Sequence, residues 1–356
     1  MHKSPGEALQ RLLDESSLLS SSQPIDHLLL KNMLASHYGL AGKIERLGSE
    51  KGHTFRLKAD ASEYLVKVSP SDEPELVTAL QIAAMRHLET VAQAIPVQRI
   101  KRTSDQKDSV PIDLSDGTSR TLSVFCFVDG VLWEEIEAED EHLNKLGNML
   151  GRANRALQVF EHPASMRSLV YDIGHFHHWA GLLDYTPDPK HRQLAQQVFK
   201  LFDEFVLPKL AGLEKQVIHG DYAPNNVVVD PGSDIFVKSI LDFGDAVHTA
   251  VIFDPANAVA HLIGRTHKKP WQDAYAFVTG YEQSRPIKAL ELPLLPVAAL
   301  ARLTMLALIR YWKAERAPEQ REELFTSANN YWTNLERAMS VPLDEVVAQF
   351  WNRATV

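Results

Sequence analysis

The chain has 356 residues, 45% of them hydrophobic, so it is long enough for one large two-lobed unit or for two domains with separate cores. Its formal net charge of −9 argues against a nucleic-acid partner, because contact with a phosphate backbone usually needs a basic face. A single cysteine, Cys126, excludes an intrachain disulfide. The N-terminal stretch has early acidic residues and no long apolar run, so we expect a cytoplasmic protein without a membrane partner.

Strand-like and helix-like segments divide between the two halves of the chain. A serine-rich stretch, Ser16–Ser22, separates a predicted N-terminal helix from a second helix around Ile25–Ser36. Short strands around one strong helix are expected from about Lys43 to Val128. Helices dominate from Trp133 onward, interrupted by short hairpins.

The first predicted loop carries glycines ahead of a strand that contains a lysine. Gly48 and Gly52 bracket Ser49 in a segment whose pattern predicts strand, loop, strand, turn and strand. Glycine lets backbone amides approach a phosphate closely because no Cβ blocks them, although an ordinary hairpin turn has the same composition. Lys67 lies in the alternating strand 64–68, and its compact ammonium suits nucleotide phosphates. A solvated lysine on the outer face of a strand is the alternative.

Two further elements complete the first half. A helix is predicted from Glu73 to Glu89, with the polar Gln81 on its inward apolar stripe. The nearly continuous apolar run Thr121–Val128 ends in an Asp-Gly pair, which predicts a buried strand followed by a turn. Cys126 would then be a small buried apolar residue.

Acidic and histidine-rich segments open the second half. The carboxylates between Glu134 and Glu141 either form a solvated helix start or place one or two side chains in an acceptor cleft, where they would bind an amine. His175, His177 and His178 raise the question of a metal site. Without cysteines or a second histidine pair at ligand spacing, a loop of hydrogen-bonded or exposed histidines is favoured.

The most informative segment runs from Val217 to Val247, because it concentrates the groups that phosphoryl transfer needs. Asp221 suits the orientation and deprotonation of an acceptor hydroxyl. Asn226, five residues later, and Asp242 suit Mg²⁺, which prefers hard oxygen ligands. Two β-branched runs around the turn Pro231–Asp234 predict a hairpin that returns Asp242 toward Asp221.

A later apolar run, Leu292–Trp312, has about the length of a membrane span. Arg302 and Arg310 fall inside it, and two prolines, Pro293 and Pro296, lie near its start. Because charged residues are rare in membrane spans, the pattern favours a buried helix of a large helical lobe.

The motif HGDxxxxN followed by DFG resembles the catalytic and metal loops of the protein-kinase-like fold. Its HGD sequence is similar to that of the aminoglycoside phosphotransferase and choline kinase branch of this fold. Within that branch, LDFGDAVHTAVIFDPANAVAHL looks most like hydroxylysine kinase and its bacterial relatives. The resemblance implies a two-lobed α+β fold. Its expected parts are an N-terminal helical extension (1–40), an N-lobe with the phosphate loop, the Lys67 strand and the hinge (41–130), and a helical C-lobe with the catalytic and metal loops (131–356).

The resemblance also implies roles for residues around the catalytic loop. Asp221 would be the catalytic base, and Asn226 with Asp242 would hold Mg²⁺. His219 would brace the catalytic loop by hydrogen bonding. Asp254, from the next helix, would bind the backbone of the same loop.

Other implied roles concern the nucleotide. Lys67 would meet the α- and β-phosphates, beside the glycine loop, and the hinge backbone near Cys126 and Val128 would contact the base. In the wider family a glutamate pairs with the lysine, whereas the matching position here is Gln81, which accepts a hydrogen bond but forms no ion pair. Glu75 is the competing partner.

The expected function is Mg²⁺-dependent transfer of the γ-phosphate of ATP or GTP to a hydroxyl of an amino alcohol or hydroxylated amino acid. The resemblance favours 5-hydroxylysine or homoserine. Asp245, His178 and Trp179 are candidates for substrate contact. The alternative is a catalytically silent relative that binds a nucleotide or a partner. The acceptor, the choice of nucleotide and the oligomeric state stay open.

Overall fold

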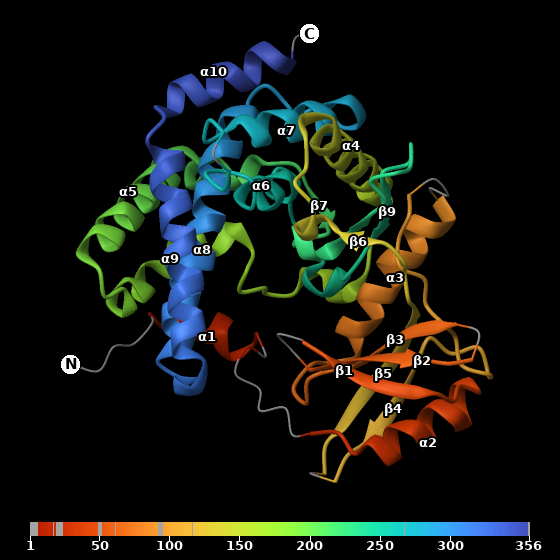
Figure 1. Cartoon of the computed structure of the whole chain (residues 1–356). Helices are drawn as coiled ribbons and strands as arrows, with labels where there is room; N and C mark the ends of the chain where they lie inside the picture. Colours follow the sequence, from red (N-terminus) through yellow and green to blue (C-terminus); the bar gives the residue numbers. More distant parts are fainter. Residues whose placement is uncertain are drawn as a thin grey trace.

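The computed structural model describes residues 6–16, 18, 24–48, 52–60, 62–91, 95–115, 117–266 and 268–354. Ser49, predicted in the phosphate loop, lies outside these ranges, whereas Gly48 and Gly52 lie inside them. The described elements form a sheet-rich N-lobe and a larger, helix-rich C-lobe (Figure 1). The predicted α+β architecture is confirmed.

A five-stranded antiparallel sheet with the order β1-β2-β3-β5-β4 forms the centre of the N-lobe. Its strands are β1 (Lys43–Leu47), β2 (His53–Lys58), β3 (Glu63–Val68), β4 (Ser109–Asp113) and β5 (Ser119–Cys126). Side chains alternate across β3, so that Val66 and Val68 are buried in the N-lobe core while Lys67 faces the cleft between the lobes. The strands predicted around the glycine loop are therefore confirmed.

Different helices cover the two faces of this sheet. Helix α2 (His27–Tyr38) packs on the outer face, where Leu30 and Leu34 join the apolar side chains of β2 and β3 (Figure 1). Helix α3 (Glu75–Val91) lies between the sheet and the C-lobe, and Leu80 belongs to the large core of the C-lobe. The predicted helix is confirmed, with both ends shifted by two residues.

The first helix packs on the C-lobe. Helix α1 (Glu7–Asp14) buries Leu9, Leu12 and Leu13 in the large core. The predicted N-terminal extension therefore contains two helices that belong to the cores of different lobes.

Seven helices follow in the described part of the C-lobe. They are α4 (Asp140–Ala156), α5 (Pro189–Phe205), α6 (Phe253–Ala260), α7 (Gln272–Ser284), α8 (Leu295–Ala314), α9 (Arg321–Met339) and α10 (Leu343–Ala354). Helix α8 packs against α5, α6 and α9 (Figure 1). The stretch Leu292–Ala314 is long and apolar enough to cross a membrane, but 94% of its most apolar window is buried inside the protein. The predicted buried helix is confirmed.

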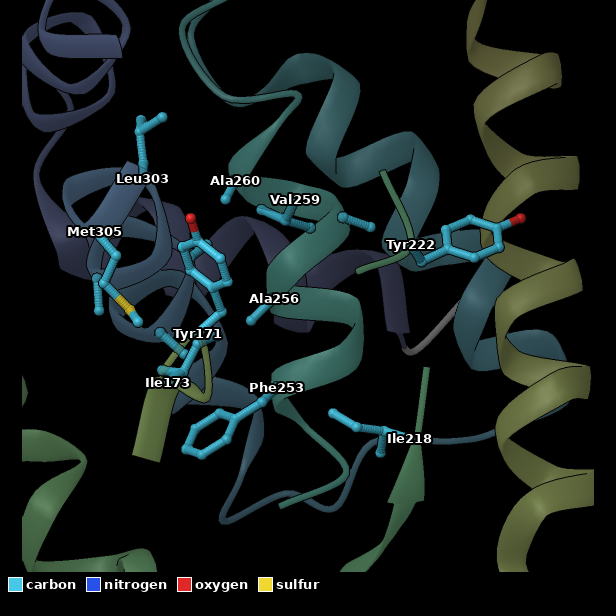
Figure 2. Packing of buried hydrophobic residues seen from close by; sticks show 14 of the residues in the cluster. Tyr171, Ile173, Ile218, Tyr222, Phe253, Ala256, Val259, Ala260, Leu303 and Met305 are labelled. Atoms are coloured by element: carbon cyan, nitrogen blue, oxygen red, sulfur yellow. The ribbon is translucent and has the colours of Figure 1, made fainter. Parts of the chain in front are cut away.

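The short helix α6 lies at the centre of this core. Figure 2 shows Ala256 and Ala260 of α6 facing Tyr171, with Met305 of α8 beyond it, while Tyr222 extends to the other side, toward α4. The hydroxyl of Tyr222 donates a hydrogen bond to the carbonyl of Leu146 in α4 (3.2 Å). Because the alanines of α6 are small, the neighbouring elements pack closely around this helix. This close packing supports the catalytic loop.

Two small sheets position the functional loops. One pairs β7 (Lys215–Ile218) with β10 (Val247–Ala250), and the other has the order β6-β8-β9, with β6 (Val131–Leu132), β8 (Val227–Val229) and β9 (Val237–Ile240). The β8–β9 pair confirms the predicted hairpin. Ile218 lies opposite Val247, so the loop after β7 meets the segment just before β10.

Candidate active site

The carboxylate of Asp221 is held on both of its oxygens. Oδ1 accepts a hydrogen bond from Nη2 of Arg302 (3.0 Å), and Oδ2 accepts one from Nδ2 of Asn226 (2.8 Å). Burial raises the pKa of Asp221 above its ordinary value, while the nearby Arg302 opposes this and Asp245 adds to it. The carboxylate thus has a fixed orientation and an environment that favours proton uptake, as a general base requires.

Three side chains fix the backbone of the catalytic loop. The imidazole of His219 donates from Nε2 to the carbonyl of Leu241 (2.8 Å) and accepts at Nδ1 from the amide of Asp221 (3.2 Å). Asp254 on α6 accepts from the backbone amides of His219 (3.1 Å) and Gly220 (2.9 Å). The Asn257 amide donates to the carbonyl of Gly220 (2.8 Å). The structure therefore gives His219 and Asp254 the bracing contacts that were predicted.

Gly220 lies where only glycine fits. Its φ is +80°, and a Cβ there would lie 2.3 Å from the carbonyl oxygen of Asp245. This close approach joins the catalytic loop to the segment after Asp242.

The β8–β9 hairpin brings Asn226 and Asp242 together. Val227 pairs with Ile240, and the amide of Leu241 donates to the carbonyl of Asn226 (2.8 Å). Asp242 adopts a left-handed conformation (φ 52°), which aspartate tolerates better than most residues. Burial tends to raise the pKa of Asp242, but Lys67 and the amide of Gly244 keep it below its ordinary value. An ionised carboxylate beside an amide oxygen is a donor set that fits Mg²⁺.

Lys67 forms an ion pair across the cleft. Its Nζ lies 2.9 Å from Oδ2 of Asp242. Gln81 lines the same cavity as Lys67, but no hydrogen bond joins the two side chains within the described residues. Glu75 is exposed at the first turn of α3, so its proposed pairing with Lys67 is wrong; Glu73 is the acidic side chain of that segment that lines the cavity.

The hinge and the glycine loop have contacts of their own. The backbone amide of Cys126 donates to the carbonyl of Arg99 (2.8 Å). The backbone carbonyl of Cys126 accepts from the side-chain amide of Gln98 (3.2 Å). A base contact through Cys126 would have to share that carbonyl, and contact through Val128 stays a prediction. Gly52 has φ +63°, and a Cβ there would lie 2.5 Å from the carbonyl oxygen of Val68. The turn itself therefore explains this glycine, and phosphate contact stays a prediction.

Two cavities adjoin the catalytic aspartate. One of about 150 Å³ lies beneath the N-lobe sheet and is lined by Lys67, Gln81 and Asp242, among others. The other, of about 720 Å³, lies within the C-lobe. Asp221 and Asp245 line both. Asp221 is therefore placed between a phosphate side and an acceptor side.

Two predicted substrate residues do not line the acceptor cavity. Trp179 is 0% exposed and packs in the C-lobe core, with its ring centroid 6.3 Å from that of Tyr171. His178 is half-buried and packs against His177, with ring centroids 3.8 Å apart. The prediction that His178 or Trp179 touches substrate is wrong for this structure, because the 3₁₀ helix that carries them (Ile173–Tyr185) turns Trp179 toward the core and His178 toward His177. Asp245 does line the cavity.

Arg302 and Arg167 are functional candidates that the sequence reasoning missed. Arg302 also donates from Nη1 to the carbonyl of Tyr171 (3.1 Å), and its side chain is 3% exposed. Arg167 donates to the carbonyls of Gly244 and Ala246, directly after the aspartate of the metal loop. An arginine inside an otherwise apolar helix was the available signal for Arg302, since a buried charge needs a partner.

The fold and the site together define a phosphotransferase with protein-kinase-like architecture. The model of the Phosphotransferase enzyme family (APH) matches residues 43–289, and the chain belongs to this family. Hydroxylysine kinase of Mus musculus is 22% identical over 333 residues, covering 87% of each chain. Hydroxylysine kinase of Danio rerio is 22% identical over 353 residues, covering 95% of this chain and 98% of the fish protein.

Solved structures show the same fold at lower identity. A microcompartment-associated aminopropanol kinase superposes with a TM-score of 0.71 at 18% identity, covering 88% of this chain and 98% of its own. An amicoumacin kinase in complex with AMP-PNP, Ca²⁺ and Ami superposes with a TM-score of 0.66 at 14% identity, covering 87% of this chain and 95% of its own. As a member of the phosphotransferase family, the chain is a kinase that transfers phosphate to a hydroxyl acceptor.

Proposed function

We propose that this protein transfers the γ-phosphate of ATP or GTP, with Mg²⁺, to a hydroxyl of a small amino alcohol or hydroxylated amino acid. 5-Hydroxylysine and homoserine are the first acceptors to test. The observation that carries the proposal is the position of Asp221, which lines both cavities and is oriented by Arg302 and Asn226.

The reaction is an in-line displacement. The acceptor oxygen forms a bond to the γ-phosphorus as the bond from that phosphorus to the β–γ bridging oxygen breaks, so the nucleoside diphosphate leaves with the bond electrons. The carboxylate of Asp221 takes the proton of the acceptor hydroxyl. Its raised pKa suits this task, because a stronger base accepts the proton more readily as the new bond forms.

The other residues of the site have binding roles. Asn226 and Asp242 would hold Mg²⁺, which neutralises phosphate charge when it is bound. Lys67 would exchange its ion pair with Asp242 for contact with the nucleotide phosphates, because both partners line the phosphate-side cavity. Arg167 fixes the backbone that follows Asp242 and so maintains the geometry of the metal loop.

An amine-bearing acceptor is supported by the acceptor-side cavity and by the relatives. Glu134 and Asp245 line the cavity and offer carboxylates to an ammonium group. Hydroxylysine and aminopropanol, after which the similar kinases are named, both carry a hydroxyl and an amine.

The test is a screen of hydroxylated amines and amino acids with ATP and with GTP, followed by diphosphate release and by mass spectrometry of the product. Asp221→Asn keeps the shape of the side chain but not its basicity. It should lower kcat by about 10²–10⁴-fold and leave nucleotide affinity nearly unchanged. Full activity of Asp221→Asn would refute the base assignment. Nucleotide binding without phosphorylation of any acceptor would favour the catalytically silent alternative.

A further inference from the structure

One face of helix α8 lines the acceptor cavity. Arg302, Leu306 and Arg310 follow one another at intervals of four residues, and all three line the cavity. Polar side chains of α9, Ser327 and Tyr331 among them, line it as well. Since a helix rises about 1.5 Å per residue, the backbone of Arg310 lies roughly 12 Å along the helix from that of Arg302, the residue that contacts Asp221.

The cavity carries charges of both signs that the protein does not fully pair. Arg302 is neutralised by Asp221. Arg265 and Arg310 also line the cavity, and no carboxylate lies within ion-pair distance of either in the described part of the chain. Of the acidic run that was predicted to face either solvent or the acceptor, Glu134 is the member that lines the cavity.

The guanidinium of Arg310 is oriented before any ligand binds. Its Nε donates to the hydroxyl of Ser327 (2.9 Å), its Nη1 approaches the carbonyl of Leu306 (3.3 Å), and its centre lies 4.9 Å from the ring centroid of Tyr331. Within the described residues, neither of these hydrogen bonds uses Nη2. A half-buried cation that is fixed in this way is suited to an anionic ligand group.

Three arginines that line the cavity also act on His261, a further lining residue. Burial, together with Arg302, Arg265 and Arg310, lowers the pKa of His261 to about 3. His261 stays neutral at any physiological pH and can donate or accept a hydrogen bond.

We propose that the acceptor is a zwitterion, a hydroxylated amino acid whose carboxylate binds Arg310, with Arg265 close by, and whose ammonium meets Glu134. This inference rests on the proposed function and narrows it from amines in general to amino acids. An amino alcohol would leave the guanidinium of Arg310 without an anion, whereas a zwitterion offers an anion to Arg310 and a cation to Glu134. The eight-residue spacing on α8 between Arg310 and Arg302, the partner of Asp221, favours acceptors in which several carbon atoms lie between the hydroxyl and the carboxylate.

The test compares acceptors that differ only in the carboxylate. The pairs are 5-hydroxylysine with 1,5-diamino-2-pentanol, and homoserine with 3-amino-1-propanol. The wild-type protein should favour the amino acid of at least one pair by about 10–100-fold in kcat/KM. Arg310→Met should abolish this preference, because it should raise the KM of the amino acid far more than that of the amino alcohol. Arg310→Lys should retain part of it.

Arg316→Met is the matched control, because Arg316 lies just after the end of α8 and does not line the cavity. It should keep the preference, and thermal melting should show that both variants are folded. A binding measurement that needs no turnover complements the kinetics. With a non-hydrolysable nucleotide present, L-lysine should bind the wild-type protein more tightly than cadaverine, and Arg310→Met should remove the difference.

The outcomes separate the two proposals. If no hydroxylated compound is phosphorylated but L-lysine still outcompetes cadaverine in an Arg310-dependent way, the proposed function fails and the carboxylate site stands. Equal use of acids and amino alcohols, or an unchanged preference in Arg310→Met, overturns the carboxylate site while the kinase activity stands. Inorganic phosphate that competes with the acceptor more strongly than L-lysine does would also overturn it, in favour of a phosphate-bearing acceptor.

Discussion

Replacing Arg302 by methionine tests how the catalytic carboxylate is tuned. Arg302 is buried, and it is the main group that counteracts the rise in the pKa of Asp221 caused by burial. Its loss should raise the pKa of Asp221 further, so a larger share of the protein would carry a protonated, inactive carboxylate at a given pH. The acid limb of the kcat/KM profile should therefore move to higher pH, and activity should recover partly as the pH rises.

The structure also sets the size of the effect. The hydrogen bond from Arg302 to Asp221 is charge-assisted and largely shielded from water, since the carboxylate is 28% exposed. Such a bond contributes about 1.5–3 kcal/mol, so its loss should lower kcat/KM most strongly on the acid side of the profile. Because the substitution leaves a partly buried carboxylate without its cationic partner, stability should also fall.

The assay is the pH dependence of kcat/KM for the best acceptor, with chemical denaturation measured in parallel. Arg302→Lys is the control, because it keeps the charge but loses the fork that reaches both Asp221 and the carbonyl of Tyr171. Its acid limb should stay closer to that of the wild type. A folded Arg302→Met variant whose pH profile superposes on the wild-type profile would refute the reasoning.

Three further changes test other parts of the site. Asp242→Ala should abolish turnover and weaken Mg-nucleotide binding in a folded protein, and an unchanged Mg²⁺ dependence of the rate would contradict the metal role of Asp242. Gly220→Ala should lower both kcat and the melting temperature. The left-handed conformation costs about 1–2 kcal/mol for alanine, and the alanine Cβ would meet the carbonyl of Asp245. A variant with wild-type melting temperature and activity would contradict this prediction. Trp179→Phe should leave the KM of the acceptor unchanged, and a large rise in KM would restore Trp179 as a substrate residue.

The sequence was most informative where the structure depends on nearby residues. The hairpin between Asn226 and Asp242 follows from two β-branched runs around a tight turn, and both are local features. The same holds for the alternating strand that turns Lys67 away from the N-lobe core. Motif spacing then added the expected roles of these residues through the resemblance to a family.

Contacts between distant parts of the chain were beyond such reasoning. Arg302 reaches Asp221 across 81 positions, and no local pattern says which residue a buried arginine will meet. The prediction for Trp179 failed for a related reason. A position in the sequence near an acceptor site does not fix the direction in which the side chain points. The Lys67–Asp242 pair likewise depends on how the two lobes sit together.

The division of the first two helices between the lobes has a mechanical consequence. Helix α1 is anchored in the core of the C-lobe and α2 in that of the N-lobe, so the lobes are joined by two covalent connections: the hinge after β5 and the peptide between α1 and α2. A shortened chain that begins at α2 would lose the second connection. It would also expose the apolar surface that Leu9, Leu12 and Leu13 cover. We therefore expect its solubility to fall before its catalytic activity does.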